Sequence, residues 1–263
     1  MTLRLTGINI YPIKSCRGIA LSEWETDTFG LRFDRRWMVV DETGTFITQR
    51  THPRMALVTV KVGDGVLQID APGMPTLETP LRPAAAVVTQ VVVWNFAGPS
   101  TWLGEAAALW FTEFLGTACS LVHMGDEVVR EANPVFAPEA TRVSFADGYP
   151  LLLISEESLA DLNSRLSQPL PMNRFRPNLV IGGDGPYVED SLGAFRLGEI
   201  EFRVVKPCDR CVVTTTDQET TERGVEPLRT LATYRKIGGE VMFGQNVIHL
   251  GTGRLSVGAP LLV

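Results

Sequence analysis

The sequence has few of the features that mark secreted or membrane-spanning proteins. Its 263 residues include only four cysteines, without even spacing, so the disulfide framework of a small secreted protein is excluded. Residues 1–6 lack the succession of charged, apolar and small residues that forms a signal peptide. The longest apolar runs, at 85–93 and 150–154, are far shorter than the roughly 20 residues needed to span a bilayer. These absences predict a cytoplasmic protein with reduced thiols and no membrane partner.

The charge balance is not that of a nucleic-acid-binding protein. The net charge is -6 and the isoelectric point is near 5.2, so no basic field covers the whole molecule. This argues against nucleic acid as the main partner but is compatible with a local basic pocket. Hydrophobic residues make up 44% of the chain and charged residues 21%, which is typical of an ordered globular protein.

The hydrophobic pattern consists mainly of short β-type segments. Runs bounded by turn residues predict strands at 5–11, 37–40, 45–49, 55–62, 66–69, 85–94, 179–181, 195–197, 201–205, 211–216 and 259–263. Helices are predicted at 105–115 and 155–166, the second with Ser155 as its N-terminal cap. Short strands with glycine turns and without alternating helices predict a mainly β protein of the α+β class. An aperiodic stretch at 133–142 predicts a boundary near residue 130, between an N-terminal β-barrel-like domain (1–130) and a β-barrel domain with peripheral helices (131–263).

Two of the four cysteines form the motif Cys208-Asp209-Arg210-Cys211. A zinc site needs further ligands at close spacing, but the other candidates are scattered singly: Cys16, Cys119, His52, His123 and His249. A thioredoxin-like pair needs a following helix, whereas the valine and threonine residues at 212–216 favour a strand. Two further alternatives stay open. The cysteines are structural, or one thiolate binds a metal whose other donors come from an organic ligand.

Basic residues lie beside turns in two places. The segment 14–18 (Lys-Ser-Cys-Arg-Gly) follows one predicted strand, and 34–37 (Asp-Arg-Arg-Trp) precedes another. Cations combined with serine hydroxyls and glycine backbone suit a phosphate or a similar anion, although ordinary solvated loops have the same composition. The segment 173–178 (Asn-Arg-Phe-Arg-Pro-Asn) offers guanidinium and amide groups that suit either a heterocycle or a surface turn.

Seven segments together resemble a known family. They are Tyr-Pro-Ile-Lys-Ser-Cys-Arg-Gly at 11–18, Asp-Arg-Arg-Trp at 34–37, Phe-Ala-Asp-Gly-Tyr-Pro at 145–150, Ser-Leu-Ala-Asp-Leu-Asn at 158–163, Arg-Phe-Arg-Pro-Asn at 174–178, Pro-Cys-Asp-Arg-Cys-Val-Val-Thr-Thr at 207–215 and Phe-Gly-Gln at 243–245. In this order, over nearly the whole chain, they resemble a MOSC-domain protein preceded by the family's N-terminal β-barrel domain. The resemblance is strongest to bacterial relatives of the mitochondrial amidoxime-reducing component.

The resemblance implies a molybdenum cofactor in a cleft between two joined β domains. Two dithiolene sulfurs of the pterin and one protein thiolate would bind the metal, and the thiolate corresponds to Cys211, with Cys208 as its neighbour. The cofactor-contacting positions map onto Lys14 and Ser15 at the phosphate end and onto Arg35, Asp147, Gly148, Arg176, Asn178, Asp209, Cys211 and Asn246. A cationic cradle of Lys14, Arg35 and Arg176 would neutralise an anionic cofactor inside an otherwise acidic protein.

The same resemblance implies an oxidoreductase that removes oxygen from small N-hydroxylated or N-oxide compounds. Longer bacterial relatives append an iron–sulfur domain that this sequence lacks, so we expect electrons from a separate ferredoxin-, flavin- or cytochrome-type protein. The alternative is a carrier of sulfur or molybdenum cofactor without reductase activity, with a persulfide on Cys211. Substrate preference cannot be carried over, because Asn246 and Gly185 replace the tyrosine and aspartate found in some relatives.

Overall fold

The computed structural model describes residues 3–84, 87–137 and 140–263. The strands of the N-terminal half are β1 (Arg4–Ile10), β2 (Ile19–Leu21), β3 (Glu23–Asp27), β4 (Gly30–Leu31), β5 (Trp37–Asp41), β6 (Thr59–Val62), β7 (Val66–Asp70), β8 (Leu77–Pro80), β9 (Val88–Val93), β10 (Phe96–Trp102) and β11 (Cys119–His123). Those of the C-terminal half are β12 (Leu151–Ser155), β13 (Leu179–Gly182), β14 (Ala194–Leu197), β15 (Ile200–Asp209), β16 (Lys236–Ile237), β17 (Glu240–His249), β18 (Gly253–Ser256) and β19 (Leu261–Leu262).

Helices are few. The α-helices are α1 (Glu105–Leu115), α2 (Glu156–Ser164) and α3 (Leu228–Leu231), and the 3-10 helices are η1 (Pro53–Leu57), η2 (Met172–Arg174), η3 (Val188–Asp190) and η4 (Val212–Thr215). This predominance of short strands confirms the predicted mainly β fold of the α+β class. None of the helices in the described part of the chain combines the length and the apolar character that a membrane span requires.

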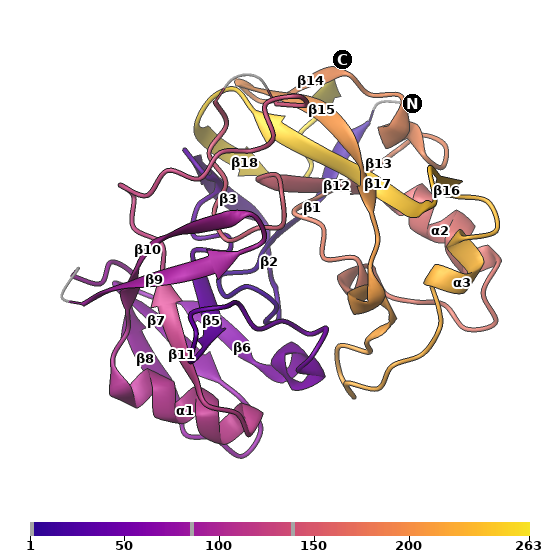
Figure 1. Ribbon diagram of the computed structural model, residues 1–263. Helices are drawn as coiled ribbons and strands as arrows, with labels where there is room; N and C mark the ends of the chain where they lie inside the picture. Colours follow the sequence, from indigo (N-terminus) through magenta and orange to yellow (C-terminus); the bar gives the residue numbers. More distant parts are fainter. Residues whose placement is uncertain (1–2, 85–86, 138–139) are drawn as a thin grey trace.

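The N-terminal strand belongs to a sheet built mainly from the C-terminal half. Within the described residues, the largest sheet has nine strands in the order β19-β14-β15-β17-β12-β13-β1-β2, with β16 paired to β17. Figure 1 shows β1 running up to join the orange and yellow strands, away from the smaller sheets around α1. Those sheets have the orders β5-β11-β10-β9 and β6-β7-β8, and a third, β18-β3-β4, joins strands from both ends of the chain. The two halves are therefore tied together by β1 and β18.

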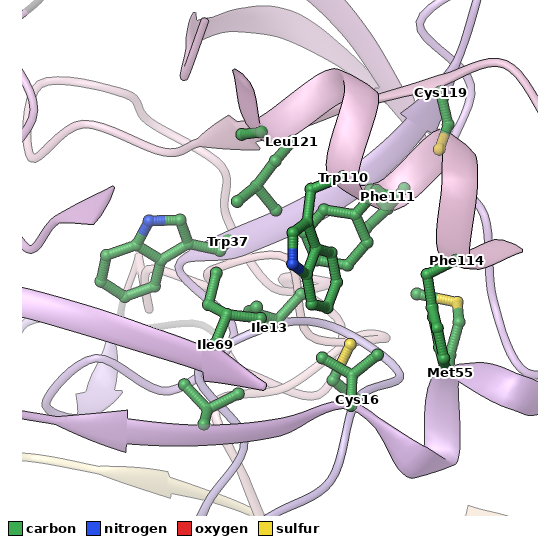
Figure 2. Close-up of a cluster of buried hydrophobic side chains, with 14 of the residues drawn as sticks. Ile13, Cys16, Trp37, Met55, Ile69, Trp110, Phe111, Phe114, Cys119 and Leu121 are labelled. Atoms are coloured by element: carbon green, nitrogen blue, oxygen red, sulfur yellow. The ribbon is translucent and has the colours of Figure 1, made fainter. Parts of the chain in front are cut away.

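The two largest of five apolar clusters in the described residues support these sheets. The first lies beneath α1, where Trp110 packs against Phe114 in the same cluster as Trp37 of β5 (Figure 2). Cys16 is fully buried in this core, and Figure 2 shows its sulfur among aliphatic and aromatic side chains. The second core packs against the nine-stranded sheet, where β12 is buried along its whole length. Burial of both faces explains the continuous apolar run of β12, which forms a parallel pair with β13 across α2.

Both predicted α-helices are confirmed, and local chemistry explains their ends. The predicted helix at 105–115 is α1, which ends at Gly116, whose left-handed conformation (φ 70°) carries no Cβ penalty. At α2, the Ser155 hydroxyl accepts the backbone N–H of Ser158 at 3.0 Å and caps the first turn, as predicted. Parts of three predicted segments, 1–2, 85–86 and 138–139, lie outside the described residues.

Two predicted strands of the N-terminal half are wrong in part. The segment 45–49 makes only isolated bridges, at Thr45 and Phe46. The segment 55–62 begins as the 3-10 helix η1 and becomes strand β6 only at Thr59. A proline at the start of η1 fixes a helical φ and favours this turn over extended backbone.

The strand predicted at 211–216 is also wrong, because this segment forms the 3-10 helix η4. The hydroxyls of Thr214 and Thr215 donate to the carbonyls of Cys211 and Val212 at 3.0 and 2.8 Å. These local bonds offer the backbone an alternative to a sheet and outweigh the β-propensity of threonine and valine. The expected strand therefore gives no argument against a redox pair, although the four residues of η4 are also not the long helix of a thioredoxin-like site.

Candidate functional site

One cleft lies between loops of the N-terminal half and the large sheet. The empty space in it, including the part open to solvent, is about 810 Å³. The structure brings all the residues predicted for the site together on its walls: Lys14, Ser15, Arg35, Asp147, Gly148, Arg176, Asn178, Asp209, Cys211 and Asn246. They come from six separate parts of the chain, so the cleft is a tertiary feature.

Two loops that are hydrogen-bonded to each other position Lys14 and Arg35. The backbone N–H of Lys14 donates to the carbonyl of Trp37 at 2.8 Å, and that of Arg35 donates to the carbonyl of Tyr11 at 2.9 Å. The buried Asp34 carboxylate accepts the backbone N–H of Tyr11 at 2.7 Å. These reciprocal bonds hold the 11–18 and 34–37 segments side by side, and both cations therefore face the same cleft.

Lys14 is a buried cation with a defined set of partners. Its ammonium donates to the Asp147 carboxylate at 2.5 Å and to the Phe145 carbonyl at 2.8 Å. Burial lowers the pKa of Lys14 to about 8, although the Asp147 carboxylate opposes this shift. For Asp147, desolvation raises the pKa, but the Lys14 ammonium holds it well below its usual range. At neutral pH this pair is a salt bridge at the cleft wall.

Arg176 differs from Lys14 because no carboxylate pairs with its guanidinium among the residues that the structure describes. The group instead stacks over the Tyr11 ring, 4.2 Å from the centroid, and Arg35 also lies over that ring, at 4.4 Å. Burial lowers the pKa of Arg176 to about 10, which leaves it protonated at neutral pH. Arg35 is better satisfied, since it donates to Asp34 at 2.5 Å and to the amide oxygen of Asn178 at 2.9 Å. Arg176 is thus a cation available to an anionic ligand.

Backbone strain concentrates at this cleft. Ser15, Arg35 and Arg176 adopt left-handed conformations, with φ of 67°, 49° and 57°. Such conformations cost about 1–3 kcal/mol for residues other than glycine and persist where the surrounding structure imposes them. All three carry predicted cofactor-binding side chains, so the strain coincides with the proposed binding groups.

The four cysteines are free thiols in different settings. Cys16 and Cys119 are buried in the apolar core, and neither lines the cleft. Cys208 lies in β15 and accepts an N–H of Arg210 at 3.1 Å, and burial raises its pKa. Cys211 lies just before η4 and accepts an N–H of Arg50 at 3.3 Å. Both motif thiols are half-buried in the cleft, each with its own arginine.

The cleft is cationic although the protein is acidic. Five cations and two carboxylates line it, a formal excess of three positive charges, in a chain with a net charge of -6. Two of the cations, Arg50 and Arg210, were not predicted as site residues. Arg210 lies between the two motif cysteines, so the motif itself carried a signal. Arg50 belongs to a turn without a motif, and only the tertiary fold brings it to Cys211.

The donors in the cleft fit an anionic cofactor whose metal takes one protein thiolate. In the described part of the chain, no three His, Cys, Asp or Glu side chains cluster as a metal site. Cys211 is a free thiol, and among the described residues Arg176 has no carboxylate partner and the buried Nε of Arg210 has no hydrogen-bond partner. Together they offer a soft sulfur donor and unsatisfied cationic donors within one cleft.

Family comparisons match both halves of the chain. Residues 2–118 match the MOSC N-terminal beta barrel domain, and residues 140–262 match the MOSC domain. The chain belongs to the MOSC-domain family. It is 37% identical to mitochondrial amidoxime-reducing component 1 of Mus musculus, across 96% of this chain and 79% of that protein.

Two further relatives extend the comparison. The Homo sapiens mitochondrial amidoxime-reducing component 1 is 35% identical across 96% of this chain and 80% of that protein. The molybdenum cofactor sulfurase of Oryza sativa subsp. japonica is 33% identical across 92% of this chain, which spans 32% of that longer protein. This MOSC protein therefore belongs to a family related to molybdenum-cofactor chemistry.

Proposed function

We propose that this MOSC protein is a molybdenum-cofactor-dependent oxidoreductase that reduces small N-hydroxylated or N-oxide compounds. The observation that carries the proposal is the Cys211 thiol, which lies in a cationic cleft and accepts a hydrogen bond from Arg50 at 3.3 Å. The names of the relatives support this chemistry, since two are amidoxime-reducing components and one is a molybdenum cofactor sulfurase. The proposal includes a cleft between two domains, 1–130 and 131–263.

The residues of the cleft have distinct proposed roles in holding the cofactor. Cys211 would be the protein ligand to molybdenum. Lys14 and Ser15 would bind the phosphate end, where a positively charged, partly desolvated site strengthens hydrogen bonds to an anion. The pterin and the remaining walls would be contacted by Arg35, Asp147, Gly148, Arg176, Asn178, Asp209 and Asn246. The left-handed backbone at Ser15, Arg35 and Arg176 would fix these donors before the cofactor binds.

When bound, the cofactor supplies a two-electron couple suited to oxygen removal. For an amidoxime, the N–O bond breaks, two electrons and two protons are taken up, and an amidine and water are released. The electrons would come from a separate ferredoxin-, flavin- or cytochrome-type protein. Arg50 would donate to the Cys211 sulfur and withdraw charge from it, as hydrogen bonds around a metal ligand do. Lys14, whose pKa is about 8, holds a proton at Nζ in the same cleft.

A reductase assay with matched cysteine variants tests the proposal. Wild type, Cys211→Ala and Cys208→Ala would be supplied with a reduced viologen as artificial donor and benzamidoxime as substrate. We expect Cys211→Ala to lose more than about 100-fold in activity, because ligand loss exceeds the 10–100-fold typical of groups beyond the ligands. Cys208→Ala should stay within several-fold of wild type. A Cys211→Ala protein that retains molybdenum and full activity would contradict the proposal.

A carrier of sulfur or molybdenum cofactor is the second candidate. The half-buried Cys211 thiol with an arginine donor would also stabilise a persulfide, and one relative is a molybdenum cofactor sulfurase. Intact-mass measurement separates the two functions. A persulfide on Cys211 without pterin would favour the carrier, whereas pterin and molybdenum near one per chain would favour the reductase.

A further inference from the structure

A second hollow adjoins the cofactor cleft and shares part of its wall. Asp147, Gly148 and Tyr149 line both spaces. We call the second hollow the vestibule, and its other walls include Trp94, Phe96, Glu131 and Asn133. It opens beside the tip of the β9–β10 hairpin, so any molecule in it would lie next to the shared wall of the cofactor cleft.

Trp94 is an exposed aromatic residue held in a costly conformation at this junction. Its side chain is 42% exposed, and its backbone is left-handed at φ 54°. The indole N–H donates to Asp147 at 3.2 Å, and the ring packs 5.0 Å from Phe46 and 4.7 Å from the Arg50 guanidinium. These contacts fix the ring orientation while leaving much of the ring open to solvent. A fixed, exposed indole can stack on a planar ligand.

Carboxylates give the vestibule the opposite charge character to the cleft. Lys14 and Trp94 both donate to Oδ1 of Asp147, so Oδ2 has no donor among the described residues. The Lys14 ammonium keeps the pKa of Asp147 low, although desolvation opposes this, so Oδ2 is a hydrogen-bond acceptor at neutral pH. Glu131 adds a second, exposed carboxylate. The remaining cation, Arg130, is buried and bonded to the carbonyls of Ser144, Ala146 and Asp147.

We propose that the vestibule binds the planar amidinium end of an aryl amidine. Trp94 would stack on the planar group, and Asp147 would accept its N–H donors. Aromatic faces and carboxylates together are the chemistry that recognises a planar cation. This inference rests on the proposed function, because the amidine would be the product of the reductase. Bound there, the ligand would lie at the wall shared with the cofactor cleft.

Titration of the purified full-length protein with benzamidine tests the vestibule directly. We expect saturable binding that Trp94→Ala weakens by about 3- to 30-fold, as expected for loss of a cation–π contact. Trp94→Phe should keep most of the affinity, since it retains an aromatic ring. Val88→Ala, an exposed residue of the same hairpin outside both hollows, is the matched control and should bind like wild type. Benzoate, with the same ring and opposite charge, should bind far more weakly.

Kinetics of the molybdenum-loaded protein provide the second readout. Benzamidine should inhibit the reduction of benzamidoxime, and Trp94→Ala should raise its inhibition constant by a similar factor. Equal benzamidine binding by wild type and Trp94→Ala, or equal binding of benzoate and benzamidine, overturns the vestibule even if the protein is an active molybdenum reductase. Protein that takes up neither molybdenum nor pterin when both are supplied, but binds benzamidine through Trp94, would instead sustain the vestibule and contradict the reductase.

Discussion

The cofactor cleft and the vestibule share a wall but have opposite chemistry. The cleft has a formal excess of three positive charges, whereas the vestibule presents the carboxylates of Asp147 and Glu131 beside the Trp94 indole. Asp147 lines both spaces. Its Oδ1 accepts a hydrogen bond from Lys14, whereas its Oδ2 has no donor among the described residues. One carboxylate at the junction thus completes a cationic site on one side and an acidic one on the other. The difference indicates that the two spaces are suited to different ligands, an anionic cofactor and a planar cation.

The largest expected effect distinguishes arginines that bind an anionic ligand from arginines that stabilise the fold. Arg176→Gln should weaken pyrophosphate binding to the cofactor-free chain by about 10- to 100-fold, the value of a charge-assisted hydrogen bond. Its free energy of unfolding should be unchanged or higher, because the lost cation has no carboxylate partner among the described residues. Isothermal titration and urea unfolding measure the two quantities.

Arg36→Gln is the matched control for Arg176. Arg36 lies outside the cleft, where its guanidinium donates to the Met124 carbonyl at 2.6 Å and to Asp126 at 2.7 Å. Its loss should lower the free energy of unfolding by about 1–3 kcal/mol, because it leaves a buried carbonyl unsatisfied. Pyrophosphate binding should be retained. If both variants lost stability equally and neither lost binding, Arg176 would be a structural residue.

The second effect depends on pH and involves Lys14. Its folded pKa of about 8 lies below the ordinary value of 10.5, and a bound anion would raise it again. Sulfate, whose charge is constant in this range, should bind fully below pH 8. Its affinity should then fall by up to about tenfold per pH unit above pH 8, because binding then requires uptake of a proton. Lys14→Gln should bind sulfate weakly, and its affinity should not change with pH in this range. If the affinity of the variant still fell above pH 8, Lys14 would not be the group that takes up the proton.

The smallest expected effect concerns Glu131, the exposed carboxylate of the vestibule. Glu131→Gln should weaken benzamidine binding by less than about fivefold, because an exposed ion pair contributes about 0.2–1 kcal/mol. The effect should shrink further in high salt. Sulfate binding in the cleft should not change. A larger loss of sulfate affinity than of benzamidine affinity would mean that the two spaces do not differ in charge as described.

Much of the cleft could be predicted because its residues lie in recognisable motifs. The segments around Lys14, Arg35, Arg176 and Cys211 carry the family resemblance, whereas their local patterns of turn and charge alone left solvated loops and structural cysteines open, and the structure places them on one cleft. Helix α1 was predicted from a segment with apolar residues all round, and in the structure it ends at Gly116. These features are determined by residues close together in the sequence.

Other features depended on tertiary contacts. Arg50 and Trp94 come from turns without a motif. The fold brings the Arg50 guanidinium over the Trp94 ring and within hydrogen-bond distance of the Cys211 sulfur. The segment 211–216 was predicted as a strand from residue propensity, but threonine hydroxyls bond to its own carbonyls and produce η4. Such local competition and long-range contact are not visible in a propensity pattern.

The molybdenum and pterin content of the purified chain, with and without the Cys211 thiol, tests the central claim most directly. Molybdenum would be measured by mass spectrometry of the metal and pterin by the fluorescence of its oxidised form. The account predicts one molybdenum and one pterin per chain in wild type and Cys208→Ala, and loss of molybdenum in Cys211→Ala. Equal molybdenum content in Cys211→Ala and wild type, or a wild-type chain that takes up neither component when both are supplied, would contradict it.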